Sequence, residues 1–127
     1  MASSSAPRIV TLKAGAAISK GMAVKFGADQ NHVVKGAANT DRCFGIAQND
    51  ATAAEDPVEV AIQGGGGKAK LSESVNPGDY LVSHTDGTLA KANAEGDVVV
   101  AVAMQSGVLN DIIGVEVVNM TAHAAIS

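Results

Sequence analysis

The chain has 127 residues, a formal net charge of −4 at pH 7 and 46% apolar residues, and only 2% of its residues are aromatic. This length fits one compact domain, because either half alone would be smaller than the size at which a hydrophobic core normally sustains itself. The acidic balance and the scattered basic residues exclude the basic surface that direct binding to nucleic acid requires, and we expect no DNA or RNA partner.

The apolar residues are mostly Ala and Val, and the aromatic residues are Phe26, Phe44 and Tyr80. Small side chains bury little area each, at roughly 25 cal/mol per Å², so the core alone should give modest stability. We therefore expect the protein to associate with copies of itself or with a larger partner. The single cysteine, Cys43, lies in an apolar run, which favours a buried small hydrophobe over a reactive thiol.

Residues 1–7 are small and polar, which predicts a flexible N-terminal arm, because such a segment gains little when it is ordered. This segment lacks the charged start and apolar centre of a signal peptide, and no run approaches the roughly 20 apolar residues of a membrane span. We expect a protein made in the host cytoplasm, with no membrane partner.

The first half of the chain is predicted to form short strands separated by turns. Alternation from Arg8 to Lys13 predicts a first strand, and a glycine turn at Gly21 precedes a second that ends at Phe26. The turn cluster 27–31 leads to a returning strand, 32–35. Further strands are predicted at 43–48 and 57–62, separated by an acidic loop, 49–56.

The second half repeats this pattern after the four glycines at 64–67. Asp86-Gly87 predicts a tight two-residue hairpin turn between strands at 80–83 and 88–91, because such a turn needs positive φ. Further strands are expected at 99–103 and 114–118. Short strands at intervals of about ten residues predict an all-β fold, a small barrel, tulip-like or sandwich domain.

The two halves also show the same pattern of residues at an offset near 57, with a slip of one residue. The segment Ile18–Val24, followed by Lys35, Asp41 and Cys43–Ala47, reappears as Val75–Leu81, Lys91, Asp97 and Val99–Ala103. A period of this length indicates a repeated supersecondary unit that does not bury its apolar face alone. We predict one β domain, 8–119, made of repeat one (8–63) and repeat two (67–119), with strands between 8 and 62 and between 67 and 119, and a flexible C-terminal tail, 120–127.

Catalytic and metal-binding patterns are weak in this sequence. Gly64–Lys68 resembles a phosphate-binding loop, but Ala69 stands where that loop needs Ser or Thr, which favours a connection or a backbone contact with a partner. The three histidines, His32, His84 and His123, have no metal-ligand spacing, and no serine lies in a nucleophile elbow. We expect no catalytic residue, metal or cofactor, and no enzymatic activity.

Three segments resemble a known family. They are Leu12–Gly21, with apolar-x-Ala-Gly followed by Ile-x-x-Gly, Asn39–Ala47, with Thr-Asp-Arg-x-x-Gly-x-Ala, and Pro57–Val60. Together they resemble the capsid decoration, or head cement, proteins of tailed bacteriophages, long catalogued as a phage family of unknown function. In the second half, Asp97–Ala103 keeps the spacing but lacks the Arg and the Gly.

The resemblance implies a β-rich structural virion protein that binds the outer surface of an icosahedral head. It would cement neighbouring major capsid subunits against the pressure of packaged DNA, and such proteins form homotrimers or, in other cases, dimers. The expected partners are therefore the major capsid protein and further copies of the chain. At the level of segments, we expect contacts from the N-terminal arm, the glycine connection and the C-terminal tail: Ser3, Ser4, Ser5, Pro7, Arg8, Gly64, Gly65, Gly66, Gly67 and His123.

Two other interpretations remain open. Val75–Val82 is similar to the turn of lipoyl and biotinyl carrier domains, but the predicted hairpin tip at Asp86-Gly87 has no lysine to modify. A β-barrel module that binds a carbohydrate or another small ligand is the third hypothesis, although the chain has few Trp or Tyr rings for stacking on a sugar.

Overall fold

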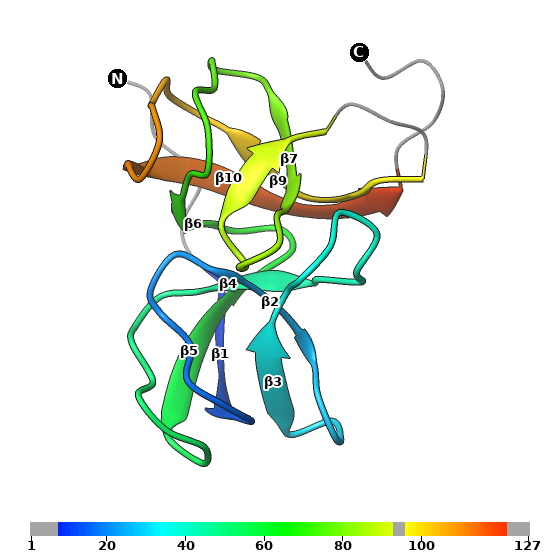
Figure 1. The fold of residues 1–127 in the computed structure, drawn as a ribbon, viewed down its shortest axis with the longest axis vertical. Coiled ribbons are helices and arrows are strands. Elements are labelled where there is room, and N and C mark those ends of the chain that lie inside the picture. Colours follow the sequence, from blue (N-terminus) through cyan, green and yellow to red (C-terminus); the bar gives the residue numbers. More distant parts are fainter. Residues whose placement is uncertain (1–7, 93–95, 122–127) are drawn as a thin grey trace.

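The computed structural model of the chain describes residues 8–92 and 96–121, with side chains up to residue 118. All regular structure in these ranges is β-strand, which confirms the predicted all-β class (Figure 1). None of the described residues forms a helix that is long and apolar enough to cross a membrane. The strands are β1 (Ile9–Ala14), β2 (Ala23–Phe26), β3 (His32–Lys35), β4 (Gly45–Ala47), β5 (Pro57–Ile62), β6 (Gly66–Lys70), β7 (Tyr80–Ser83), β8 (Leu89–Lys91), β9 (Val98–Ala103) and β10 (Ile112–Thr121).

The strands form two sheets that lie one above the other in Figure 1. The lower sheet is a closed barrel in the order β1-β3-β2-β4-β5, with β1 pairing back onto β5. The upper sheet has five strands in the order β6-β10-β9-β7-β8, and the long β10 runs across the upper half of the molecule in Figure 1. Each sheet is therefore built from one half of the chain.

Both sheets follow the same strand order when β1–β5 are matched with β6–β10, but only the first closes into a barrel. Its closing contact is the parallel pairing of Lys13 with His32 and of Ala14 with Val33. In the second half the matching contact is reduced to one parallel bridge between Leu71 and Leu89. The outer edge of β8 is consequently less covered than any strand of the barrel.

The turns of the two halves also match in backbone conformation. Gly21 and Gly78 have φ of 91° and 90°, and Glu55 and Asn110 have φ of 74° and 73°. Positive φ at two residue pairs in corresponding places is hard to reach by chance, because non-glycine residues rarely adopt it. The equivalence allows the two halves to be compared position by position.

The core is aliphatic and continuous between the halves. One buried cluster joins Ala23 and Ile46 of the barrel to Leu71, Leu81 and other residues of the upper sheet. A second cluster, which includes Val33, Val58 and Val60, fills the barrel. The largest fully buried side chains are Ile, Leu and Val, and none of the three aromatic rings is among them. All three aromatic residues are therefore available, at least in part, for surface contacts.

Several predicted boundaries differ from the structure, and three of them affect the connections and the tail. Gly66 and Gly67 belong to β6 and do not form part of a flexible connection, because both pair with β10. The Asp86-Gly87 hairpin spans residues 84–88, with only Gly87 at positive φ, which is a turn followed by a bulge. The predicted tail begins too early, because β10 continues through residue 120 to Thr121, paired with β9.

Candidate interaction surfaces

Most of the predicted contact residues of the tails lie outside the described residues. These are Ser3, Ser4, Ser5 and Pro7 of the arm, and His123 of the C-terminal tail. Arg8 is the first described residue and is exposed. Its guanidinium donates a hydrogen bond to the Gln63 carbonyl oxygen at 3.2 Å, which brings the start of β1 against the connection between the halves.

The glycine connection offers less surface than the sequence predicted. Gly64 is exposed, has a φ of 92° and lies under the Arg8 side chain. Gly65 and Gly66 are buried, and Gly67 is half-buried and paired with Val115. Of the four predicted glycines, only Gly64 is therefore placed to meet a partner, and Arg8 already shields it.

An apolar groove lies at the open end of the barrel, beside the start of β1. It has a volume of about 500 Å³, and its apolar lining consists of Val10, Leu12, Phe26, Phe44 and Ile62. Three polar side chains complete the lining, from Arg8, Gln30 and Gln63. The groove exists because β1 pairs with β3 only from Lys13 onward, so the earlier residues of β1 have β5 as their described neighbour on one side only.

Two stacked phenylalanines form the aromatic part of this groove. The rings of Phe26 and Phe44 stack with centroids 4.3 Å apart and an interplanar angle of 12°, and Phe26 is 51% exposed. A flat, preformed aromatic surface of this kind loses little side-chain entropy when it binds, which is why such rings dominate protein interfaces. The sequence showed these rings only as part of a poor core, whereas the structure places them in a surface groove.

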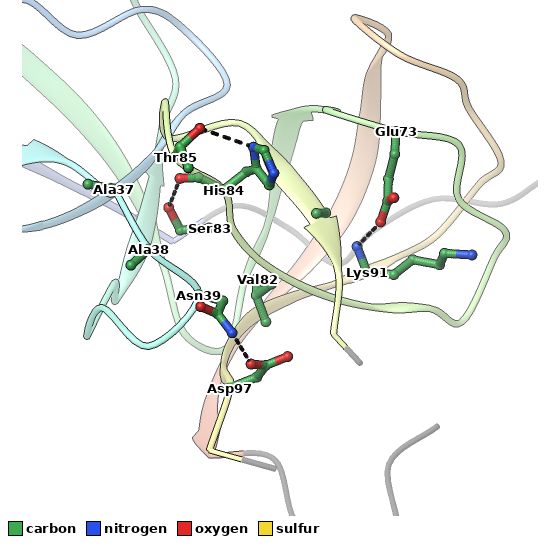
Figure 2. A pocket seen from close by; sticks show the side chains of 11 residues that line it. Ala37, Ala38, Asn39, Glu73, Val82, Ser83, His84, Thr85, Lys91 and Asp97 are labelled. Carbon is green, nitrogen blue, oxygen red and sulfur yellow. Dashed lines mark hydrogen bonds between the residues drawn. The ribbon is translucent and has the colours of Figure 1, made fainter. Parts of the chain in front are cut away.

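A second, more polar pocket of about 380 Å³ lies where the loop after β3 meets β7 and β8 (Figure 2). The Asn39 side-chain amide donates to the Asp97 carboxylate, and the Asn39 carbonyl accepts the Val98 N–H at 2.8 Å. The Ser83 hydroxyl donates to the His84 carbonyl at 3.0 Å. The two bonds of Asn39 join the halves, whereas the Ser83 bond stays within the second half, so the polar groups named here bind to the protein itself.

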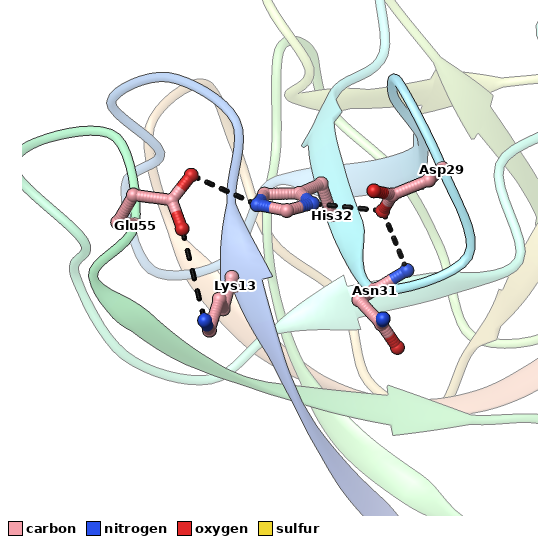
Figure 3. A network of polar contacts seen from close by, with 5 residues as sticks. All are labelled: Lys13, Asp29, Asn31, His32 and Glu55. Atoms are coloured by element: carbon pink, nitrogen blue, oxygen red, sulfur yellow. Dashed lines mark hydrogen bonds and ion pairs between the residues drawn. The ribbon is translucent and has the colours of Figure 1, made fainter.

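The third surface feature is a polar network on the barrel around His32 (Figure 3). One ring nitrogen, Nδ1, lies 2.8 Å from Asp29 Oδ1, and Nε2 lies 2.8 Å from Glu55 Oε2. Lys13 Nζ adds an ion pair with Glu55 at 3.8 Å. His32 thereby links the turn after β2 to the acidic loop before β5, a contact that the sequence did not reveal because Glu55 is 23 residues away.

Charge within this network shifts two pKa values. The hydrogen bond to Asp29, followed by that to Glu55, raises the pKa of His32. The same hydrogen bond from His32, together with one from the Asn31 backbone N–H, lowers the pKa of Asp29. No group of three or more His, Cys, Asp or Glu side chains among the described residues is arranged to hold a metal ion. The contacts of His32 with Asp29 and Glu55 join the turn after β2 to the loop before β5, and we call these three residues the clasp.

Cys43 and Asp41, which the sequence analysis singled out, both contribute to the structure of the barrel half. Cys43 is buried as predicted, and burial raises the pKa of its thiol to about 11, which disfavours the reactive thiolate. Asp41, from the Thr-Asp-Arg segment, accepts hydrogen bonds from Lys25 Nζ at 2.9 Å and from the Ala37 N–H at 2.8 Å. These contacts hold the pKa of Asp41 below its usual value and fix the loop between β3 and β4.

The fold is similar to that of a phage head protein. Neither a family model nor a curated protein matches this sequence. Among solved structures, the N base of the head fiber gp8.5 of bacteriophage phi29 matches with a TM-score of 0.68 and 13% sequence identity. The match covers 87% of this chain and 92% of that one, so it extends over both halves. The all-β fold and the resemblance to phage head-associated proteins, both inferred from sequence, thus agree with this neighbour.

Proposed function

We propose that this chain is a structural protein of a bacteriophage head, and that it acts as a decoration or cement protein on the outer surface of the shell. The single observation that carries the proposal is the fold shared with the phi29 head fiber base over nearly the whole of both chains. The residues that resemble head cement proteins support it independently, and in that motif Asp41 fixes the loop between β3 and β4.

The described surfaces suit a role in binding and not in chemistry. The polar groups at the seam between the halves are paired with one another, and the one thiol is buried with a raised pKa. The described surface does present an apolar groove, with the exposed Phe26, to which another protein could bind. Buried aromatic anchors surrounded by polar residues are typical of protein interfaces. We therefore propose a virion protein without enzymatic activity, whose partners are the major capsid protein and further copies of itself.

In this proposal the N-terminal arm and the glycine connection at Gly64 bind across neighbouring capsid subunits after the shell expands. An arm with little side-chain bulk can add to a capsid strand through backbone hydrogen bonds, which requires few specific side chains. Arg8 places the beginning of the described chain beside Gly64, so both segments would meet the shell together. Many copies on one shell would strengthen a weak individual contact through multivalency.

Co-sedimentation with expanded empty heads of the phage that encodes the chain tests this function. We expect the full chain to sediment with expanded heads in a saturable amount, and a variant that lacks residues 2–7 to bind at least tenfold more weakly with unchanged circular dichroism. No binding of the full chain would overturn the cement function. Full binding by the truncated chain would reject only the role of the arm.

The carrier alternative has no support from the turn between β7 and β8. Its five residues, 84–88, contain no lysine that a lipoyl or biotinyl group would modify. The alternative of a carbohydrate-binding module would use Phe26, but one face of that ring is already stacked on Phe44. Binding to heads, compared with binding to immobilised polysaccharide, distinguishes this alternative from the cement function.

A further inference from the structure

The two halves share one fold but differ at two corresponding surface positions. The turn before β10 contains Val108 and Leu109, which are 55% and 60% exposed, and Ile112 beside them is 44% exposed. The matching turn in the first half contains Ala53 and Ala54. Large apolar side chains on a solvent-exposed turn carry an unfavourable hydration free energy that the first half avoids.

Hydrogen bonds from its own backbone N–H groups fix the conformation of this apolar turn. The Val108 N–H donates to Asp111 Oδ2 at 3.0 Å, and the Asn110 N–H donates to the Leu71 carbonyl at 2.9 Å. The first half makes the equivalent bonds, from the Ala53 N–H to Asp56 Oδ2 at 3.1 Å and from the Glu55 N–H to the Ala14 carbonyl at 2.7 Å. The same scaffold therefore presents two different tips, and the tip of the second half, Val108–Leu109, is a preorganised apolar knob.

The groove shows the opposite asymmetry. Phe26 at the end of β2 corresponds to Ser83 at the end of β7, and Ser83 is buried. Leu12 of β1 corresponds in the same way to Ala69 of β6, which is also buried. The first half thus carries an apolar groove without an apolar knob, and the second half carries an apolar knob without a groove.

We infer that the Val108–Leu109 knob of one copy of this chain inserts into the barrel groove of the next copy, lined by Phe26, Phe44 and Leu12. The groove volume of about 500 Å³ accommodates side chains of this size. Charges agree with this occupant, because Arg8 lies on the groove and Asp111 lies beside the knob, where both are exposed. Opposite charges at the rim of an apolar contact guide its encounter and register.

Such a contact joins two different surfaces, so it is head-to-tail and leaves one knob and one groove free on every pair. It therefore closes into a ring, or continues as a chain, when more copies are added. The contact needs no capsid, and it stands or falls independently of the proposed binding to heads.

Mixing two variants that each lack one surface provides the test. Leu109→Asp should remove the knob and Phe26→Asp the groove, and each variant alone should be a monomer in sedimentation velocity at about 50 µM. In the mixture, the intact knob of one variant meets the intact groove of the other. We expect a 1:1 pair with twice the mass of one chain and nothing larger, whereas the unmodified protein forms larger closed or open assemblies.

Ala54→Asp is the matched control, because it places the same charge on the equivalent turn of the first half and should leave association unchanged. Circular dichroism shows whether each variant is folded, and Val108→Ala/Leu109→Ala, which copies the turn of the first half, should weaken association at least tenfold if either charged variant misfolds. An unmodified protein that is a monomer would overturn the inference. The inference also fails if the folded charged variants still associate, if their mixture stays monomeric, or if removal of residues 2–7 is needed to expose the groove.

Discussion

Gly36 shows how closely the two halves are packed at the level of single residues. It is buried at the end of β3, and a Cβ placed there would overlap Ser83 Oγ of the second half and lie 2.6 Å from Cys43 Sγ. Real Cβ atoms essentially never approach other atoms so closely. The absence of a side chain at residue 36 is therefore a condition for the contact between the barrel and the upper sheet.

We predict that Gly36→Ala lowers the free energy of unfolding by about 1–3 kcal/mol, the usual effect of overpacking a filled core. Gly27→Ala is the control, because Gly27 is exposed and the nearest atom to its added Cβ is Val34 Cγ1 at 3.3 Å. That variant should change stability by less than about 0.5 kcal/mol. Urea denaturation of both variants measures the difference, and equal stability would contradict the close packing described at Gly36.

His32 gives a second prediction, in the pH dependence of stability. The pKa of His32 is raised in the folded protein. The stabilisation from its contacts with Asp29 and Glu55 is therefore fully present below the pKa of about 6.5 in the unfolded chain, and it is lost as the pH rises through the pKa in the folded protein. Since the pKa of Asp29 is lowered, its contribution is present above the unfolded value of about 3.9 and is lost in acid. The clasp should therefore stabilise most between about pH 5 and 6.5.

His32→Gln should reduce stability near pH 5.5 and match the unmodified protein more closely near pH 8.5. The effect should be small, because Asp29 and Glu55 are mostly exposed and water screens their charges. Denaturation midpoints at the two pH values provide the measurement. A stability gap that stays constant, or that widens toward pH 8.5, would show that protonated His32 does not hold the two loops together.

At the scale of elements, β8 is the strand that most needs protection. It lies at the edge of the upper sheet, and among the described strands it pairs only with β7, apart from the single Leu71 bridge. The Lys91 N–H of this edge donates to Glu73 Oε2 at 2.7 Å, as Figure 2 shows. A carboxylate that lies against an edge strand satisfies a backbone N–H and repels other sheet edges, which prevents unwanted strand pairing.

Glu73→Ala should therefore increase the hydrogen-exchange rate of the Lys91 amide several-fold, because its acceptor is gone. Glu73→Gln keeps an acceptor oxygen and should retain most of the protection. Exchange followed by NMR at residue resolution separates the two variants. Equal exchange of Lys91 in both variants and in the unmodified protein would contradict the role of Glu73 as a cover for this edge.

Sequence patterns predicted the positions of the strands better than the way in which the strands pair to close the barrel. Residues 32–35, 57–62 and 80–83 were predicted with the bounds that the structure has, because alternation and flanking turn residues mark them locally. Whether β1 reaches β3 depends on pairing between residues far apart in the chain, which no local pattern records. The groove follows from that incomplete pairing, and for this reason Phe26 and Phe44 could not be recognised as surface residues.

The knob could not be matched from the sequence offset alone. An offset near 57 places Ala53-Ala54 over Asn110-Asp111, and only the equivalent turn bonds to Asp56 and Asp111 place these alanines over Val108-Leu109. The prediction of a connection at 64–67 is wrong for Gly66 and Gly67, which begin β6, because these glycines lack the β-branched side chains that signal a strand.

For the molecule as a whole, the central claim is that a barrel and a sheet of matching topology form a structural part of a phage head. The most direct measurement is a cryo-EM map of expanded heads of the encoding phage, compared with heads from which this protein has been removed. We predict density outside the shell that fits the two stacked sheets of Figure 1 and disappears in the depleted heads. Identical maps from the two preparations would contradict the claim.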